Sequence, residues 1–265
     1  MKKVLYIMIT ILVLLSAGII IVVKSVVHLE LPHGAVLHVL PNYRNITMSG
    51  AVIICPGGGY SYLEKWYEGY MWFPFFYLRG YMPAMLEYRM PKHDYKIPLV
   101  DGVEAIILVR KKAKEWHFDE NNVGIMGSSA GGHLASTMMV IDNDEVRPDF
   151  GILFYPVISM KKELTHIDSH NKLLGKDASG WLESHFSNEL HVSEKTPPAF
   201  IAVTRDDKCV SPQNSILFHK EMRVKNRPAE LHVYPSGGHG FVCRIRSEYR
   251  GQALEDLSDW LSKKK

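Results

Sequence analysis

Cysteine, net charge and low-complexity sequence are all scarce in this chain of 265 residues. The three cysteines are too few and too widely spaced for a disulfide scaffold or a zinc ribbon. Lys and Arg exceed Asp and Glu by only 31 to 28, which makes no polyanion-binding surface, so nucleic acid is not an expected partner. Without Gly/Ser-rich linkers or internal repeats, and with 46% hydrophobic residues, the sequence favours one folded domain and excludes a disordered chain.

Motifs for nucleotides and metals are missing as well. The Gly-x-x-x-x-Gly-Lys pattern and the dinucleotide spacing Gly-x-Gly-x-x-Gly are absent, so no cofactor is expected. His166 and His170 have the i, i+4 spacing of a metal pair. No Glu follows His166 in the zincin pattern and no third ligand is evident, so we interpret this segment as a solvated loop and expect no metal.

One uncharged apolar run, from Val4 to Val23, stands near the start of the chain. As a helix it would be ~30 Å long, which is enough to cross a hydrocarbon core. Lys2 and Lys3 precede it, which predicts a cytoplasmic N-terminus and export of the rest. The run continues past the best cleavage candidate, so an uncleaved signal anchor is favoured over a signal peptide within residues 1–28. Residues 30–265 are then membrane-anchored outside the cytoplasm, or periplasmic or secreted if the segment is cleaved.

From residue 30 onward, short apolar runs alternate with stretches of helical spacing. The expected strands are 35–40, 51–55, 83–88, 123–126, 150–155, 199–204 and 230–234, and the expected helices are 103–115, 131–140, 213–224 and 249–261. Continuous apolar strands between amphipathic helices predict an α/β fold, with a mostly parallel sheet covered on both faces. Residues 158–196 are polar and poorly periodic, and we expect them to form a cap or insertion over the sheet edge where ligands bind.

Gly127-Ser-Ser-Ala-Gly131 lies directly between an expected strand and an expected helix. A Gly-x-Ser-x-Gly on such a turn reverses the backbone sharply and exposes the hydroxyl of its central residue, Ser129. The helix N-terminus beside it can stabilise negative charge. The alternative is a plain glycine-rich turn, and the motif alone does not exclude it.

Three consecutive glycines follow the expected strand 51–55, in the segment Pro56-Gly-Gly-Gly-Tyr60. Glycine in series is entropically costly and suits a backbone that must approach a ligand oxygen closely. Since the phosphate-binding spacings are missing, an oxyanion hole is the favoured interpretation, with a flexible surface turn as the alternative.

Acid and imidazole candidates follow the last two expected strands. Asp206 and Asp207 come after strand 199–204, and His239 comes after strand 230–234. A serine hydroxyl needs a His to remove its proton, and that His needs a carboxylate to hold its tautomer. In a parallel sheet all these loops meet at one edge, and the order Ser129, Asp207, His239 is the one this architecture requires.

Together these segments resemble the α/β-hydrolase superfamily, in particular its small carbohydrate-esterase and lipase-like group of acetyl-xylan-type and feruloyl-type esterases. The resemblance runs from about residue 35 to the C-terminus, in the segments 56–60, 124–133, 206–215 and 237–241. It implies the α/β-hydrolase fold, with Ser129 as nucleophile, His239 as general base and Asp207 as acid. Asp207 is chosen over Asp206 because the family separates its acid from a Val, here Val210, by two residues.

The resemblance also implies that the backbone N–H groups of Gly58, Gly59 and Ala130 form the oxyanion hole, although Pro56 stands where related esterases usually have His. The implied activity is that of a serine carboxylic-ester hydrolase acting on xylan-type carbohydrate, with no cofactor. A serine peptidase of the prolyl-oligopeptidase type and an inactive hydrolase-fold binding protein are the alternatives.

Two smaller expectations concern residues near these loops. His133, four residues after Ser129, is expected to pack within its helix and not to act as a second base. Cys209 and Cys243 lie close in sequence to Asp207 and His239, so they could form a disulfide in an oxidising compartment, with Cys55 left free.

Overall fold

The computed structural model describes residues 26–42 and 46–264. The apolar run at residues 4–23, predicted to be a signal anchor or signal peptide, lies outside the described residues. Within the described part, none of the helices has the length and hydropathy needed to cross a membrane. The first strand begins at Val27, three residues before the expected start of the catalytic domain.

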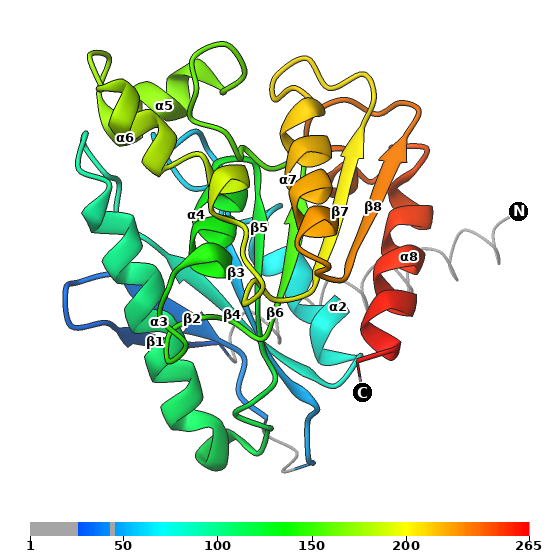
Figure 1. Cartoon of the computed structure of the whole chain (residues 1–265). Helices are drawn as coiled ribbons and strands as arrows, with labels where there is room; N and C mark the ends of the chain where they lie inside the picture. Colours follow the sequence, from blue (N-terminus) through cyan, green and yellow to red (C-terminus); the bar gives the residue numbers. More distant parts are fainter. Residues whose placement is uncertain (1–25, 43–45, 265) are drawn as a thin grey trace, which may run out of the picture.

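An eight-stranded sheet in the order β1-β2-β4-β3-β5-β6-β7-β8 forms the centre of the protein (Figure 1). Strands β1, β2 and β4 pair antiparallel, and every pair from β4 to β8 is parallel. The strands are β1 (Val27–Glu30), β2 (Val36–Val39), β3 (Gly50–Cys55), β4 (Tyr81–Glu87), β5 (Val123–Ser128), β6 (Phe150–Phe154), β7 (Ala199–Thr204) and β8 (Ala229–Tyr234). The mostly parallel sheet predicted from the sequence is confirmed, and β1 is an additional edge strand.

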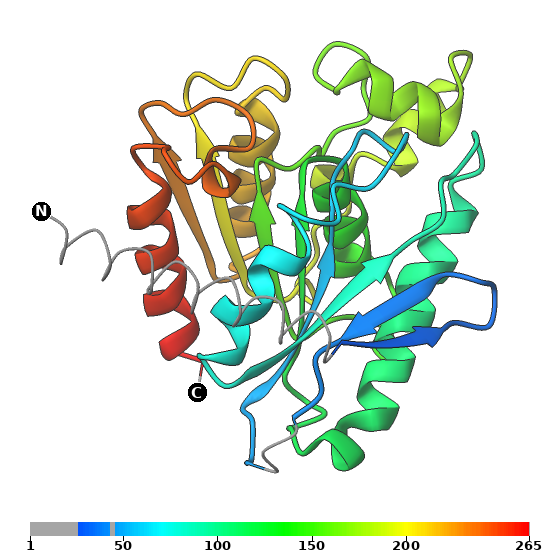
Figure 2. The ribbon, with the colours of Figure 1, turned by 180° about the vertical axis from the view of Figure 1, so that it is seen from behind.

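Helices cover both faces of the sheet. The α-helices are α2 (Phe73–Tyr77), α3 (Lys96–Trp116), α4 (Ser129–Val140), α5 (Ile167–Leu174), α6 (Gly180–His185), α7 (Gln213–Val224) and α8 (Arg250–Ser262), and the 3-10 turns are η1 (Tyr70–Trp72), η2 (Asn188–His191) and η3 (Phe241–Cys243). Helices α3, α4 and α7 lie on one face and α2 and α8 on the other, as the two opposite views show (Figures 1 and 2).

Burial on both faces explains the continuous apolar strands. Along β3, Ala51, Ile53 and Cys55 face the cluster beneath α3, α4 and α7, whereas Val52 and Ile54 face the cluster beneath α2 and α8. Successive side chains of a strand point to opposite faces, so a strand covered on both sides needs apolar residues at every position. The same covering leaves the carboxyl ends of the parallel strands as the open edge.

The segment 158–196 lies over this carboxyl edge, where α5 and α6 project beyond the strands at the top of Figure 1. The prediction of a solvated loop around His166 and His170 is wrong. His166 caps the N-terminus of α5, and His170 is fully buried, with its Nε2 3.0 Å from the Glu183 carboxylate of α6. These helices are too short to show a clear apolar period in the sequence, and the fold buries one side of α5, with Ser169, His170, Leu173 and Leu174.

His133 is a buried residue of α4 and packs within the core, as its helical position predicted. Its Nδ1 lies 2.9 Å from the Tyr60 hydroxyl and its Nε2 lies 2.8 Å from the Phe186 carbonyl. A carbonyl only accepts, so Nε2 carries the proton and Nδ1 accepts from Tyr60. Burial disfavours the charged ring and lowers the pKa of His133 to about 4.

We expect His133→Gln to weaken the acid sensitivity of the fold. The folded protein keeps this ring neutral down to about pH 4, whereas the unfolded chain takes up the proton near 6.5. Between these values the unfolded state binds more protons, so falling pH removes up to ~3 kcal/mol of stability through this group alone. Denaturant unfolding of both proteins at neutral pH and near pH 4 measures the effect. A difference between them that stays constant with pH would contradict the prediction.

Candidate active site

Ser129 occupies the sharp turn between β5 and α4. Its φ of +53° lies in the left-handed region, which is strained for a residue with a side chain. The flanking glycines are required by close contacts. A Cβ on Gly127 would lie 2.2 Å from the Gly131 carbonyl oxygen, and one on Gly131 would lie 2.0 Å from the Cys55 carbonyl oxygen. This crowding holds the Ser129 hydroxyl at the carboxyl edge of the sheet.

His239 and Asp207 meet Ser129 at this edge, although the three residues are far apart in the chain. The Nε2 atom of His239 lies 2.9 Å from the Ser129 Oγ, and its Nδ1 lies 2.8 Å from Oδ2 of Asp207. Asp207 is 6% exposed. As a carboxylate it accepts a hydrogen bond from the Nδ1–H group, which leaves the unprotonated Nε2 free to accept the proton of the Ser129 hydroxyl.

The neighbouring carboxylate, Asp206, faces a different group. It accepts the backbone N–H groups of Gly237 at 3.2 Å and Gly238 at 2.9 Å, and so holds the loop that carries His239. The second oxygen of Asp207, Oδ1, accepts the backbone N–H groups of Cys209 and Val210 at 2.9 and 3.0 Å. The two adjacent aspartates therefore have different partners: Asp206 binds the loop backbone and Asp207 binds the imidazole of His239.

The glycine segment after β3 lies against the same site. Gly58 and Gly59 have φ values of +125° and +64°, and both line a cavity of about 290 Å³ together with Ser129. A Cβ on Gly58 would lie 2.2 Å from the Tyr62 carbonyl oxygen, so this position excludes larger residues. Ala130 is fully buried in the first turn of α4, directly after Ser129. All six residues singled out from the sequence thus lie together at the carboxyl ends of β3, β5, β7 and β8.

Glu68 also belongs to this site and was missed in the sequence. It is 8% exposed, and its Oε2 accepts the backbone N–H of Gly57 at 2.7 Å while its Oε1 accepts the Tyr155 hydroxyl at 2.9 Å. Burial raises the pKa of this carboxyl. No spacing marked it, because Glu68 stands inside an aromatic-rich stretch eleven residues from Gly57. Only the folded loop brings the two together.

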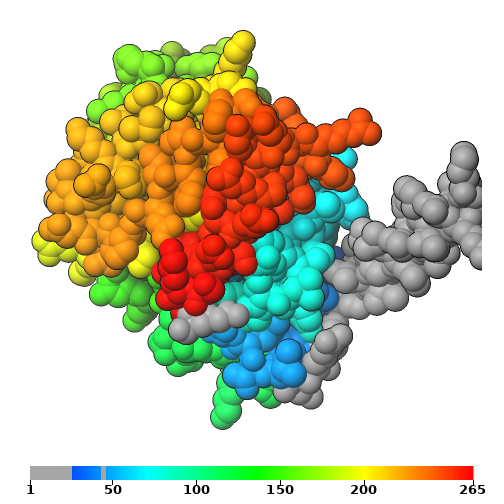
Figure 3. Space-filling model, turned by 90° about the vertical axis from the view of Figure 1, so that its right-hand side faces the viewer, coloured from blue at the N-terminus to red at the C-terminus, as the bar shows by residue number. Residues whose placement is uncertain are grey.

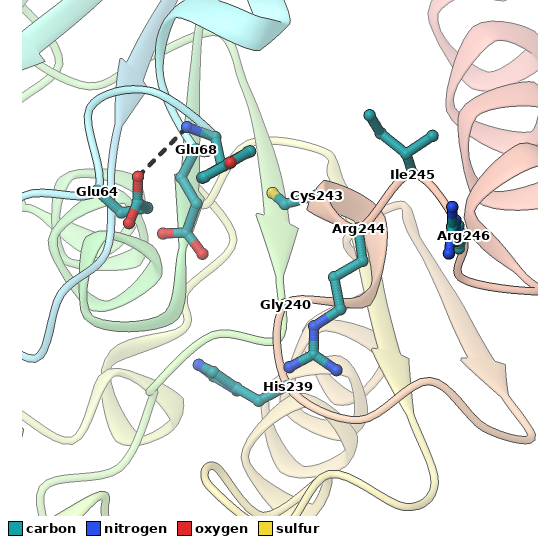
Figure 4. A pocket seen from close by; sticks show the side chains of 9 residues that line it. Glu64, Glu68, His239, Gly240, Cys243, Arg244, Ile245 and Arg246 are labelled. Carbon is teal, nitrogen blue, oxygen red and sulfur yellow. Dashed lines mark hydrogen bonds between the residues drawn. The ribbon is translucent and has the colours of Figure 1, made fainter.

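A second and larger cavity, of about 550 Å³, adjoins the first (Figure 4). His239, Glu64 and Glu68 line both cavities, whereas Ser129 lines only the smaller. The rest of the larger cavity is formed by Tyr67 and by the loop between β8 and α8.

The possible disulfide between Cys209 and Cys243 is not present, and both thiols are free, as is that of Cys55. The Sγ of Cys243 lies 3.3 Å from the Tyr155 hydroxyl, and burial raises the pKa of its thiol to about 12. Cys209 instead lines the smaller cavity. Nearness in sequence to Asp207 and His239 did not determine the directions of these side chains. Among residues 26–42 and 46–264, no group of three or more His, Cys, Asp or Glu residues could hold a metal ion.

Comparison with known proteins places the chain in a family. The BD-FAE family model matches residues 39–222. An acetylxylan esterase of Xylanibacter ruminicola is 40% identical over 215 residues, which cover 80% of this chain and 45% of that protein. An endo-1,4-β-xylanase B of Butyrivibrio fibrisolvens is 35% identical over 208 residues, covering 72% of this chain and 32% of that protein. The chain thus spans less than half the length of either relative.

A solved structure shares the architecture described above. The acetyl ester-xyloside bifunctional hydrolase of Caldicellulosiruptor lactoaceticus superimposes with a TM-score of 0.81 at 32% identity, over 88% of this chain and 89% of that one. The α/β-hydrolase fold predicted from the sequence is therefore confirmed. Because the family model also spans most of the sheet and the turn that carries Ser129, this chain belongs to the BD-FAE family and has the α/β-hydrolase fold.

Proposed function

We propose that this chain is a serine carboxylic-ester hydrolase that removes acyl groups, acetyl in particular, from xylan-type carbohydrates. The observation that carries the proposal is the hydrogen-bonded series from the Ser129 hydroxyl through His239 to the buried Asp207. Similar proteins named acetylxylan esterase and acetyl ester-xyloside hydrolase support the choice of substrate class.

In the proposed reaction, the Ser129 Oγ attacks the ester carbonyl carbon while His239 Nε2 takes the hydroxyl proton. The carbonyl oxygen becomes an oxyanion, which the backbone N–H groups of Gly58, Gly59 and Ala130 stabilise. The intermediate collapses as His239 returns the proton to the departing sugar oxygen, and the acyl group stays on Ser129. A water molecule, deprotonated by His239, then attacks the acyl carbon, and the acid leaves as Ser129 regains its proton.

Asp207 supports both halves of this reaction without exchanging a proton. Its carboxylate keeps the His239 proton on Nδ1, so that Nε2 faces Ser129 as a base. When His239 becomes an imidazolium, the adjacent negative charge stabilises it.

A substrate panel tests the proposal. With the full chain, acetylated xylo-oligosaccharides and p-nitrophenyl acetate are expected to release acetate, and a feruloyl ester shows how large an acyl group the site accepts. Preferential cleavage of a peptidyl substrate would favour the serine-peptidase alternative. Binding of the oligosaccharide without turnover of any ester would favour an inactive binding protein.

We expect Glu68 to act as a positioning residue for the oxyanion loop. Glu68→Ala leaves the buried N–H of Gly57 without its acceptor, so the adjacent Gly58 and Gly59 N–H groups lose their alignment. The loss of one oxyanion donor costs about 10²-fold in kcat, and we expect a similar effect with little change in KM. Steady-state kinetics on p-nitrophenyl acetate measure this split.

Glu68→Gln is the matched control for this prediction. Its amide oxygen can still accept from Gly57 while its NH₂ group donates to the Tyr155 oxygen, so most of kcat should return. Equal kcat values for the wild-type protein and the Ala variant would contradict the positioning role. A fall in the melting temperature with unchanged kcat would assign Glu68 to stability alone.

We further propose that the chain acts outside the cytoplasm, anchored by residues 4–23 or released by cleavage there. The support is the basic pair followed by the uncharged apolar run. Intact mass measured on protein recovered from the washed membrane fraction of cells expressing the full chain distinguishes an anchored chain from a cleaved one. Full-length protein found only in the cytosolic fraction would contradict export.

A further inference from the structure

The larger cavity beside His239 has two walls of different charge. One wall comes from the loop after β3 and carries Glu64, Tyr67 and Glu68; the other comes from the loop between β8 and α8 and carries Arg244 and Arg246. Figure 4 shows both glutamates on one side, with the Arg244 side chain extending from the other side toward His239. In the space-filling view the orange-red loop before α8 stands out from the surface beside the cyan segment (Figure 3).

The positions of the two cavities separate the two halves of an ester. The acyl carbon must be bonded to Ser129 with its oxygen near Gly58 and Gly59, and these three residues line the smaller cavity. The alcohol oxygen must lie within reach of His239, which lines both cavities. On the tetrahedral carbon, the acyl chain and the alcohol oxygen point in different directions. The alcohol half therefore extends past His239 into the larger cavity. Its volume of about 550 Å³ is within the usual range for ligand sites.

The lining of this cavity suits a sugar. Tyr67 is 50% exposed and its ring offers a flat apolar face, while the carboxylate of the partly exposed Glu64 can accept hydrogen bonds from hydroxyl groups. Glu68 is occupied by Gly57 and Tyr155, so Glu64 is the carboxylate available on this wall.

The arginine wall carries positive charge that a neutral sugar would not use. Within the described part of the chain, no carboxylate forms an ion pair with either arginine, and the Arg244 guanidinium makes one hydrogen bond, at 3.3 Å, to the Gly237 carbonyl. Both arginines are exposed. Guanidinium groups bind carboxylates through paired, charge-assisted hydrogen bonds. The glutamates on the opposite wall repel an anion and so direct it toward Arg244 and Arg246.

We propose that this cavity binds the alcohol half of the substrate and prefers a carbohydrate ester that carries a uronate group, whose carboxylate pairs with Arg244 while Arg246 adds positive charge to the same wall. The sugar ring lies against Tyr67 and hydrogen-bonds to Glu64. This inference rests on the proposed esterase function, because it takes His239 as the group that protonates the leaving sugar.

The test compares kcat/KM for two acetylated xylo-oligosaccharides, one with a glucuronate branch and one without. At low salt the full-length wild-type protein is expected to prefer the branched ester. In the double variant Arg244→Gln/Arg246→Gln this preference falls about tenfold, the effect of losing one charge-assisted hydrogen bond. Raising the ionic strength should reduce the wild-type preference as well.

Arg223→Gln is the matched control for a change in overall charge. Arg223 is exposed at the end of α7 and lines neither cavity, so the wild-type preference should persist in this variant. Equal kcat/KM for the two esters in the wild-type protein, or the same preference in the double variant, would overturn the inference. Loss of preference in the Arg223 variant would also overturn it, since overall charge would then explain the effect.

A binding measurement separates this inference from the proposed function. Titration calorimetry with Ser129→Ala and an unacetylated, glucuronate-branched xylo-oligosaccharide measures the site without catalysis. Tighter binding of the branched than of the linear sugar, lost in the arginine double variant, supports the cavity assignment even if no ester is hydrolysed. Absence of turnover on every ester would refute the esterase function alone, whereas equal binding of both sugars would refute the arginine site.

Discussion

Ser129→Ala is expected to abolish ester hydrolysis, with a fall in kcat on the order of 10⁶-fold. The substitution removes the hydroxyl oxygen that His239 contacts and that forms the acyl-enzyme, while leaving His239 and Asp207 paired. A methyl group fits the turn, because the strain at Ser129 comes from its backbone φ of +53° and not from the hydroxyl. Release of acetate from p-nitrophenyl acetate and from acetylated xylo-oligosaccharide measures the loss.

Ser128→Ala is the matched control for the Ser129 variant. The neighbouring hydroxyl is buried and, within the described part of the chain, has no hydrogen-bond partner, so its removal should leave most of the activity intact. Circular dichroism and the melting temperature of both variants establish that they are folded. Substantial turnover by a folded Ser129→Ala protein, free of contaminating esterase, would remove the nucleophile from the proposed mechanism.

Asp207→Asn is expected to lower kcat by about 10⁴-fold with the fold retained. The N–H groups of Cys209 and Val210 hold one oxygen of this side chain, so the amide oxygen of Asn would stay there. The NH₂ group would then face His239 Nδ1 and donate to it. This forces the imidazole proton onto Nε2, which can no longer accept the proton of Ser129.

Asp206→Asn tests whether the two adjacent aspartates have different roles. Asp206 accepts the backbone N–H groups of Gly237 and Gly238 in the His239 loop, and an Asn at this position keeps one acceptor oxygen. We therefore expect its kcat to fall by less than about tenfold, the cost of a weakened positioning hydrogen bond. If the Asp206 variant lost more activity than the Asp207 variant, the assignment of the acid would be wrong.

Most of the fold could be predicted from the sequence, because strands covered on both faces must be apolar at every position. The strand 199–204 and the helix 213–224 agree with the structure at both ends. The strand β1 was not predicted, since its four residues are mostly exposed and its two apolar positions, Val27 and Leu29, are too few to establish a strand period. The helices α5 and α6 were also missed, since each is too short for its apolar face to repeat.

The sequence by itself determined the alternation of strands and helices and the position of Ser129, because both follow from local rules of burial and backbone geometry. Tertiary structure decided which aspartate faces His239, where Glu68 contacts the glycine loop, and why Cys209 and Cys243 stay apart. It also decided that two cavities meet at the imidazole. These features depend on the directions of side chains in loops, which no periodicity controls and which only the packing of distant segments against each other sets.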